Sequence, residues 1–313
     1  MSQNINTDLV EFIRTEWGRS VPVEVEAAAQ DIAARYGDSA VGIIFYGSCL
    51  RTGEIEDKVL DFYVIVDSYQ NAYKGRVLAI ANKILPPNVF YHETDVKDMT
   101  LRSKYAVLSL EDLAFRTSRD CLNVSVWARF CQPCMLLLPR DDLAFDAITQ
   151  AIAQAVITMF LNISELKPQT IKSRELWVEA FKATYAAELR TERTNKGLEI
   201  YLLDQERYER LTPLVLKALG MSTEPEKLIH QPSRMSVWYP KLKWMARRWN
   251  GKIVSFLRLL KATTTFVGGI DYLAWKIRSH SGVEVEVKDW MRKWPVIAGI
   301  SLFWSLRKKG AFK

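Results

Sequence analysis

The sequence predicts an α+β protein: a mixed sheet with helices, followed by a mainly helical region and a C-terminal amphipathic helix. Three observations lead to this class. Short apolar runs rich in β-branched and aromatic residues recur between residues 40 and 138, as in buried strands. After Pro139 the apolar spacing becomes helical and strand signals are few. Apolar residues make up 49% of the 313 residues and charged residues 25%, a composition that supports a real core.

The first part of the chain alternates helical and strand patterns. We expect helices over 8–17, 22–36, 74–84 and 123–130, and strands over 40–46, 58–66, 89–91, 105–108 and 134–138. Pro22 suits the first turn of its helix, where a backbone N–H is not needed. Ser109, with Asp112 three residues later, predicts another helix start of the capping-box kind.

The second part predicts long helices. Helical spacing covers residues 141–163, 173–192 and 195–219, and Pro168 and the stretch 220–225 interrupt it. We therefore expect three regions: a sheet-containing domain over 1–139, a helical domain over 140–225 and a basic, tryptophan-rich helical region over 226–313.

Charge is unevenly distributed along the chain. The net charge is +7, but residues 231–313 alone carry 17 Lys and Arg against 4 Asp and Glu. The same segment holds seven of the ten tryptophans, so the two ends of the chain are expected to face different partners. Four cysteines in so long a chain do not form a disulfide framework, which favours a reducing compartment.

Gly47, Ser48 and Asp61 form the skeleton of a nucleotidyltransferase site: a strand ending in Gly-Ser, a loop, and a strand opening with Asp. Glycine lets backbone approach a phosphate without a Cβ. Serine offers a hydroxyl and an N–H to phosphate oxygens. Aspartate is a hard oxygen ligand for Mg²⁺, which bridges triphosphate oxygens and neutralises developing charge. The chemistry expected is in-line attack on the α-phosphorus with pyrophosphate leaving.

The usual second carboxylate of such a site is missing. It would lie two residues after Asp61, on the same face of the strand, and that position is Tyr63. A second metal ligand has to come from elsewhere, and the candidates are Glu54, Glu56, Asp57 and Glu93, of which we choose Glu56. The alternative interpretation is a plain Gly-Ser turn followed by a solvated strand-edge aspartate.

Longer motifs around these residues resemble one family. Phe-Tyr-Gly-Ser-Cys over 45–49, Val-Leu-Asp-Phe-Tyr-Val-Ile-Val-Asp over 59–67, Ser-Lys-Tyr-Ala-Val-Leu-Ser over 103–109 and Ala-Arg-Phe-Cys-Gln-Pro over 128–133 carry the likeness. They resemble the mitochondrial-type CDP-diacylglycerol synthases, the translocator assembly and maintenance proteins or phosphatidate cytidylyltransferases. The family's Gly-Ser-Gly is Gly-Ser-Cys here, and its Trp-His is Tyr73-Lys74.

The resemblance implies that CTP and phosphatidic acid give CDP-diacylglycerol and pyrophosphate with Mg²⁺, for phospholipid synthesis. It also implies a nucleotidyltransferase domain and a winged-helix-like helical domain. Carried over residue by residue, it gives Gly47, Ser48 and Asp61 the triphosphate and metal roles and makes Lys104, Arg129 and Lys196 site candidates. We therefore expect Asp61, Ser48 and Lys104 to be catalytic, and Gly47, Ser48, Arg129 and Lys196 to bind the nucleotide. The metal is expected on Asp61, with Glu56 from the loop as the second ligand chosen above.

The C-terminal segment has the composition of an interfacial membrane helix. An apolar stretch over 295–306 is too short to span a bilayer, and it lies between aromatic and basic residues. The membrane contacts expected are Trp290, Trp294, Trp304, Arg307 and Lys308. The alternative is a helix docked on the protein's own core. We interpret the other basic stretch, residues 241–261, as a solvated helix face that could instead bind a lipid phosphate or nucleic acid.

These features predict a peripheral membrane protein, on the cytoplasmic face in a bacterium or at the mitochondrial inner membrane in a eukaryote. No apolar run reaches the roughly 18–20 residues of a spanning helix. One alternative is a nucleotidyltransferase acting on RNA or another acceptor, and another is a non-catalytic membrane-binding module. Because the tail's tryptophans cluster with aliphatic residues, an anionic membrane surface is favoured over nucleic acid as the partner.

Overall fold

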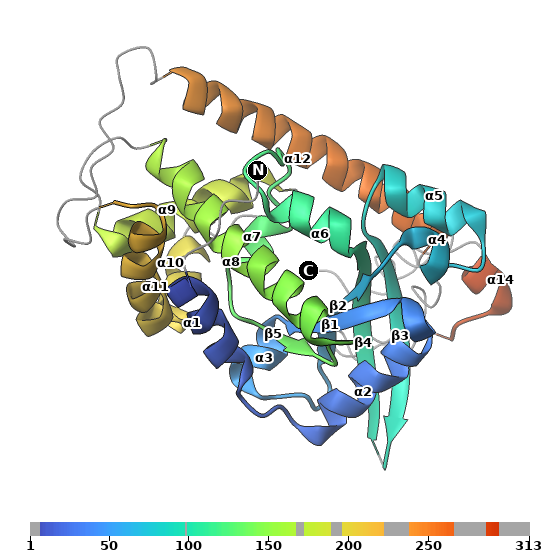
Figure 1. Ribbon diagram of the computed structural model, residues 1–313. Coiled ribbons are helices and arrows are strands. Elements are labelled where there is room, and N and C mark those ends of the chain that lie inside the picture. Colours follow the sequence, from blue (N-terminus) through green and yellow to red (C-terminus); the bar gives the residue numbers. More distant parts are fainter. Residues whose placement is uncertain are drawn as a thin grey trace.

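The computed structural model describes residues 7–97, 99–166, 172–188, 196–221, 238–265 and 286–293 (Figure 1). Within these ranges a mixed five-stranded sheet is surrounded by helices, and a mainly helical part follows it in the chain. The predicted α+β class is therefore confirmed.

The sheet has the strand order β3-β4-β2-β1-β5. Its strands are β1 (Ala40–Tyr46), β2 (Val59–Val66), β3 (Asn88–Val96), β4 (Met99–Ser109) and β5 (Cys134–Leu137). β2 and β4 run parallel, and the other neighbouring pairs are antiparallel. β1 and β2 are almost fully buried, which explains why their sequences are apolar except at Gly42 and Asp61.

The β3–β4 hairpin is much longer than the two short strands predicted at 89–91 and 105–108. Its outer part carries polar side chains on both strands, because it extends past the core at the edge of the sheet. A pattern search that looks for apolar alternation finds only the part that lies over the core. Lys97, in the left-handed conformation at φ 54°, lies in the turn between the strands.

Each face of the sheet has its own aromatic cluster. On one face Phe45 packs on Phe62, and Tyr105 packs against Tyr36, which follows α2 (Val23–Ala34). On the other face Tyr46 and Tyr63 pack against Phe130 of α7 (Trp127–Phe130). The side chains of Tyr46, Asp61 and Tyr63 therefore share the face that α7 covers, because side chains alternate along a strand.

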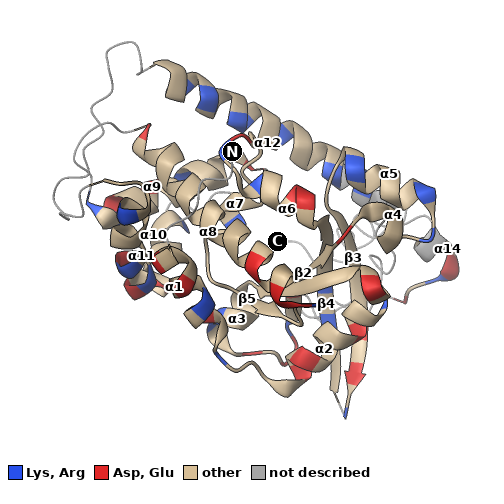
Figure 2. Ribbon diagram, viewed as in Figure 1, with Lys and Arg blue, Asp and Glu red and all other residues tan. Residues whose placement is uncertain are grey.

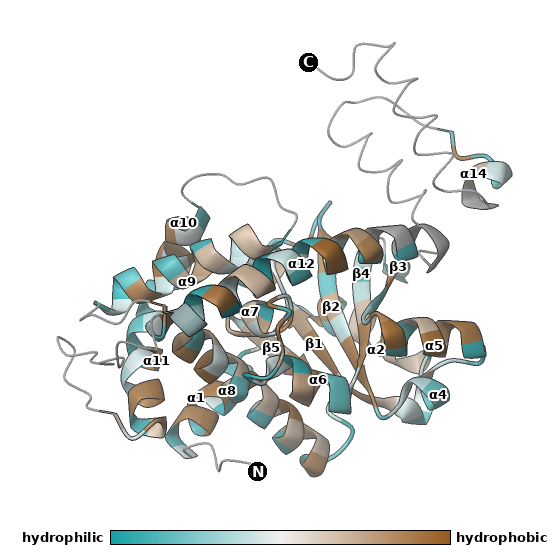
Figure 3. Ribbon diagram, turned by 90° about the horizontal axis from the view of Figure 1, so that it is seen from above, coloured by the Kyte–Doolittle hydropathy of each residue, from teal (hydrophilic) through white to brown (hydrophobic). Residues whose placement is uncertain are grey.

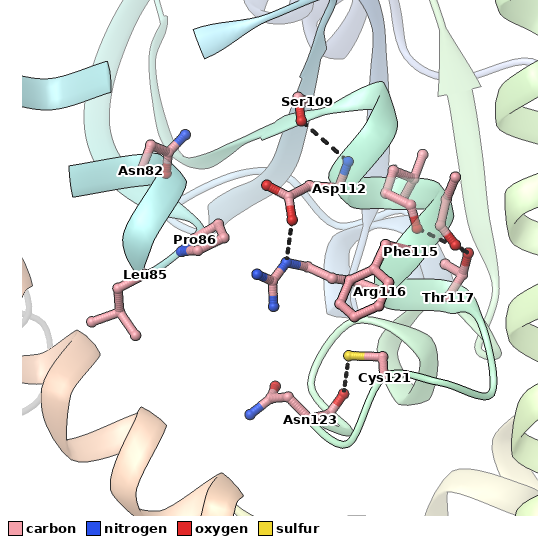
Figure 4. Close-up of polar contacts among 12 residues, drawn as sticks. Asn82, Leu85, Pro86, Ser109, Asp112, Phe115, Arg116, Thr117, Cys121 and Asn123 are labelled. Atoms are coloured by element: carbon pink, nitrogen blue, oxygen red, sulfur yellow. Dashed lines mark hydrogen bonds and ion pairs between the residues drawn. The ribbon is translucent and has the colours of Figure 1, made fainter. Parts of the chain in front are cut away.

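The helices lie around and beyond the sheet. Besides α2 and α7, the structure describes α1 (Thr7–Trp17), a 3₁₀ turn (Gly37–Ser39), α3 (Ser48–Thr52), α4 (Tyr69–Ala72), α5 (Arg76–Ile84), α6 (Leu110–Thr117), α8 (Asp142–Ser164), α9 (Ser173–Ala187), α10 (Lys196–Leu203), α11 (Gln205–Ala218), α12 (Trp238–Thr265) and α14 (Asp289–Lys293). The predicted start of α6 is confirmed: Ser109 Oγ accepts a hydrogen bond from the Asp112 backbone N–H at 3.1 Å (Figure 4).

Three predicted helices differ from the structure. The helix expected over 173–192 ends at Ala187, because Glu188 has an extended backbone. The helix expected over 123–130 begins only at Trp127, because the Asn123 side chain accepts hydrogen bonds from the Ser125 N–H and hydroxyl and holds a loop there. The helix expected over 195–219 is broken at Asp204 into α10 and α11. The apolar spacing continues through this break, so the sequence pattern does not reveal it.

One hydrophobic core runs from the sheet into the helical part, across residue 139. α8 is its centre, and it packs against α1, α6, α7, α9 and β1. Among the described helices, α8 is long and apolar enough to cross a membrane, contrary to the sequence expectation, but 67% of its apolar window is buried inside the protein. Its hydropathy is therefore explained by its position in the core. The division into three regions stays a prediction.

A buried ion pair joins the helical part to the N-terminal helix. Arg207 of α11 donates to both carboxylate oxygens of Glu16 at 2.6 and 3.0 Å, and to the Cys131 carbonyl at 2.8 Å. Such bidentate geometry fixes orientation. It holds α1 and α11 against the turn that leads into β5.

The C-terminal part is described only in pieces. α12 is a long helix that crosses α9 and reaches β3, and α14 is short (Figure 1). Trp290 in α14 is partly exposed. The other predicted membrane contacts, Trp294, Trp304, Arg307 and Lys308, lie outside the described residues, and so does the expected C-terminal amphipathic helix.

Candidate active site

A cavity of about 260 Å³ lies where β1 ends and β2 begins. It is lined by all six residues that were predicted to act in catalysis or nucleotide binding: Gly47, Ser48, Asp61, Lys104, Arg129 and Lys196. They come from the β1–α3 turn, β2, β4, α7 and α10, which are far apart in the sequence. The fold therefore brings the predicted residues together at one place.

Gly47 has a backbone conformation that is essentially restricted to glycine, with φ 97° and ψ −160°. It also lies against the aspartate of the neighbouring strand. A Cβ at this position would be 3.0 Å from Asp61 Oδ2 and 3.4 Å from Asp61 Cβ. Both the turn and the close approach to Asp61 therefore require glycine.

Ser48 is the first residue of α3, immediately after this turn. The first N–H groups of a helix have no partner within the helix, so those of α3 are available to a ligand at its start. The serine hydroxyl adds another hydrogen-bonding group. Because Ser48 and Asp61 line the same cavity, a single ligand can contact both.

Asp61 and Lys104 are direct neighbours in the parallel ladder of β2 and β4. Lys104 Nζ is 3.0 Å from Asp61 Oδ1, and the two side chains are 41% and 24% exposed. A partly solvated ion pair of this kind contributes little to stability. It places a positive charge and a hard oxygen ligand side by side in the cavity.

Tyr63 occupies the strand position at which such sites usually have a second carboxylate. Its hydroxyl accepts a hydrogen bond from Arg129 Nη1 at 2.8 Å. The guanidinium also lies 5.3 Å from the ring centroid of Tyr46 and 5.7 Å from that of Tyr63. Burial lowers the pKa of Arg129, but the surrounding tyrosines, Glu188 and Asp61 outweigh this and raise it. Tyr63 thus serves to position a cation in the cavity.

The cavity also contains residues that the sequence analysis did not single out. Arg51 lines it and is held by Gln132 at 2.8 Å and by Asp204, whose Oδ2 is 3.5 Å from Arg51 Nε. Burial raises the pKa of Asp204. Among the described residues of the lining, four cations face two carboxylates, Asp61 and Glu188, so the cavity is suited to an anionic ligand.

Glu188 follows α9 directly and lines the cavity, whereas Glu56 does not. Glu56 is exposed in the loop before β2, beyond the end of the sheet. The choice of Glu56 as the second metal ligand is therefore not supported by its position, and Glu188 takes its place as a candidate. No sequence motif marks Glu188, because the helix that carries it belongs to the other half of the chain.

The residues present fit a magnesium ion that arrives with a nucleotide. Mg²⁺ is usually held by one or two carboxylates together with substrate phosphates, and Asp61 and Glu188 supply carboxylates at this cavity. The described residues contain no group of three or more His, Cys, Asp or Glu side chains that would hold a metal ion without such help.

Two helices, α9 and α12, make a close backbone contact next to the cavity. Gly251 of α12 lies so near the end of α9 that a Cβ there would be 2.0 Å from the Ala187 carbonyl oxygen. Ala187 precedes Glu188 in the chain. The contact between α12 and α9 therefore lies one residue from Glu188, which lines the cavity.

The Cys-Gln-Pro-Cys sequence over 131–134 lies at the edge of this cavity, because Gln132 and Pro133 line it. Both cysteines are buried and free, and burial raises the pKa of each thiol to about 12. Buried thiols of raised pKa are not reactive cysteines, so we interpret both as core residues.

Neither a protein-family model nor a curated protein matches this chain. Among solved structures, the chain is similar to a nucleotidyltransferase-like protein from Exiguobacterium sibiricum 255-15. The sequence identity is 14%, and the alignment covers 91% of this chain and 92% of the other. The likeness is distant, with a TM-score of 0.28, so the chemistry of the site has to be derived from its own residues.

Proposed function

We propose that this protein is a Mg²⁺-dependent nucleotidyltransferase that converts CTP and phosphatidic acid to CDP-diacylglycerol and pyrophosphate. The observation that carries the proposal is the shared cavity of Ser48 and Asp61, next to a glycine whose conformation and close packing admit no side chain. The choice of CTP and phosphatidic acid rests on the sequence resemblance, which covers the same residues.

The triphosphate would bind at the start of α3. Ser48 and the first N–H groups of α3 would contact phosphate oxygens, and Gly47 leaves room for them. Arg129 and Lys196 would balance the negative charge from the side of α7 and α10. Asp61, with Glu188 as the second candidate, would hold Mg²⁺, which neutralises charge on the phosphates when bound.

The acceptor needs no dedicated base. A phosphate monoester has its second pKa near 6, so most of it is already dianionic at neutral pH. One of its oxygens attacks the α-phosphorus, the bond to the β-phosphate oxygen breaks, and pyrophosphate leaves. Positioning and charge balance would supply most of the catalysis. Lys104 is placed to stabilise the developing charge, since it already lies 3.0 Å from Asp61.

The test is direct. The purified protein is incubated with labelled CTP, Mg²⁺ and vesicles that contain phosphatidic acid, and CDP-lipid and pyrophosphate are measured. We expect both products in equal amounts, and none with Asp61→Ala. Glu56→Ala is the matched control: because Glu56 is exposed outside the cavity, this variant should keep its activity. Label transferred to added RNA instead of lipid, or no product at all, would refute the proposed reaction.

A further inference from the structure

The outer face of α12 carries a continuous row of exposed apolar side chains. They are Trp238, Leu242, Met245, Trp249, Ile253 and Phe256, and each is between 53% and 74% exposed. Their spacing of three or four residues places them on one side of the helix. We call this row the α12 stripe. At 1.5 Å per residue it is about 27 Å long.

Positive charges accompany the stripe. Lys241, Arg248 and Lys252 are exposed, and their spacing of seven and four residues places them in a second row along one edge of it. The whole of α12 contains seven Lys and Arg and no Asp or Glu. Figure 2 shows the basic turns along this helix.

The opposite face of α12 fixes the helix in this orientation. Trp244 donates from Nε1 to the Asn162 carbonyl at 2.9 Å, and Arg247 Nη2 donates to the Asn162 side chain at 2.9 Å. Both side chains are buried, and Gly251 contacts α9 closely. The α12 stripe therefore faces away from the rest of the protein. Figure 3 views the molecule from the side on which α12 lies.

The same buried face touches the wall of the candidate active site. Arg258 donates from Nη1 to Ser125 Oγ at 2.8 Å, and Ser125 lines the cavity. Arg258 and Lys261 also donate to the carbonyls of Pro86 and Pro87. The α12 stripe is thus separated from the cavity wall by about one helix diameter, on the order of 10 Å.

We propose that the α12 stripe docks on an anionic lipid bilayer and so holds the candidate active site close to the membrane surface. This inference rests on the proposed function, because it brings the site near a bilayer-bound phosphate ester. Exposed tryptophans and aliphatic side chains enter the boundary between headgroups and acyl chains, and the basic row faces anionic headgroups. A continuous apolar row with basic residues and no acidic residue complements such a surface.

The docking is tested by sedimentation with vesicles of phosphatidylcholine and phosphatidylglycerol, without phosphatidic acid or nucleotide. The double variant Leu242→Gln/Trp249→Gln should bind at least tenfold more weakly, because two apolar anchors are lost. The triple variant Lys241→Gln/Arg248→Gln/Lys252→Gln should lose about a hundredfold, since each cation near an anionic surface contributes about a factor of five. Val23→Gln/Leu143→Gln, which removes two apolar side chains elsewhere that are at least as exposed, should bind as the wild type does.

Three results would overturn the inference. The first is unchanged vesicle binding by both α12 variants with an unchanged melting temperature. The second is binding that disappears only when residues 294–313 are removed. The third is a change from dimer to monomer in the double variant while vesicle binding persists, which would assign the α12 stripe to a second copy of the chain.

A second assay separates this inference from the proposed function. Turnover of a short-chain phosphatidic acid in free solution should be the same in the wild type and the double variant, because the cavity residues are unchanged. Wild-type protein that binds vesicles through α12 but turns over neither substrate would refute the proposed reaction and leave the docking face established.

Discussion

Gly47 is confined both by its own backbone and by the side chain of Asp61. In Gly47→Ala, the φ of 97° costs about 1–3 kcal/mol of folding free energy. The new Cβ also pushes the Asp61 carboxylate from its position, so we expect kcat/KM for CTP to fall at least roughly a hundredfold. Gly53→Ala is the control. It has a similar φ of 71° but nothing within 4 Å, so it should lose stability and keep activity. Equal activity losses in the two variants would contradict this account.

Lys104 is expected to act on the triphosphate and not on the fold. Lys104→Met should lower kcat/KM by about a hundredfold, because a charge aimed at the reacting phosphates is lost. Since its pair with Asp61 is partly solvated, unfolding in urea should change by less than about 1 kcal/mol. Arg102→Met, two residues earlier on the same face of β4 but outside the cavity lining, should leave kcat/KM unchanged. A strong activity loss in the Arg102 variant would mean that kcat/KM depends on the total positive charge of this strand and not on Lys104 itself.

At the scale of residues, the sequence predicted which side chains line the cavity but not which residues they bond to. The residue types of Gly47, Ser48 and Asp61 predicted the cavity that they line. The hydrogen bond from Arg129 to Tyr63 could not be predicted, because it joins residues on separate elements and depends on how α7 packs on the sheet.

Among the elements, α9 and α12 approach each other closely beside the site. Gly251→Ala places a Cβ within 2.0 Å of the Ala187 carbonyl, so the helices must separate. We expect a loss of about 1–3 kcal/mol in unfolding free energy, and reduced turnover because Glu188 moves with the end of α9. Gly75→Ala, in open space at the start of α5, should change stability by no more than about 0.5 kcal/mol. Unaltered stability of Gly251→Ala in thermal denaturation would show that α12 does not press on α9.

Elements were predicted best where they are buried on both sides. β1 was predicted with its bounds as observed and β2 to within a residue, because apolar residues fill both strands apart from Gly42 and Asp61. The length of the β3–β4 hairpin was underestimated, because its outer half is polar. The break between α10 and α11 at Asp204 was missed because the apolar spacing continues through it.

For the whole molecule, residues of the sheet and of the helical part line the cavity together. Lys196 and Glu188 reach it from α10 and from the end of α9. Lys196 was predicted through the family resemblance, and Glu188 was missed, because residues from the second half of the chain carry no spacing relation to Asp61. The predicted membrane tail remains a prediction, as most of its residues lie outside the described ranges.

Stability of the whole protein should depend on metal and nucleotide together. With two carboxylates at the cavity, Mg²⁺ alone should shift the melting temperature little. CTP with Mg²⁺ should stabilise the protein by about 2.7 kcal/mol at a CTP concentration one hundred times its Kd. Adding EDTA should remove most of this gain, as followed by differential scanning fluorimetry. Stabilisation of equal size by CTP in EDTA would show that the carboxylates do not hold a metal for the nucleotide.

The most direct measurement is a crystal structure with Mg²⁺ and a CTP analogue that cannot be cleaved. The account predicts the ion about 2.0–2.1 Å from an Asp61 carboxylate oxygen. It also predicts triphosphate oxygens within hydrogen-bonding distance of the Ser48 hydroxyl or backbone N–H, with Arg129 or Lys104 contacting the phosphates. A nucleotide bound away from Gly47 and Ser48, or a metal ion that does not touch Asp61, would contradict it.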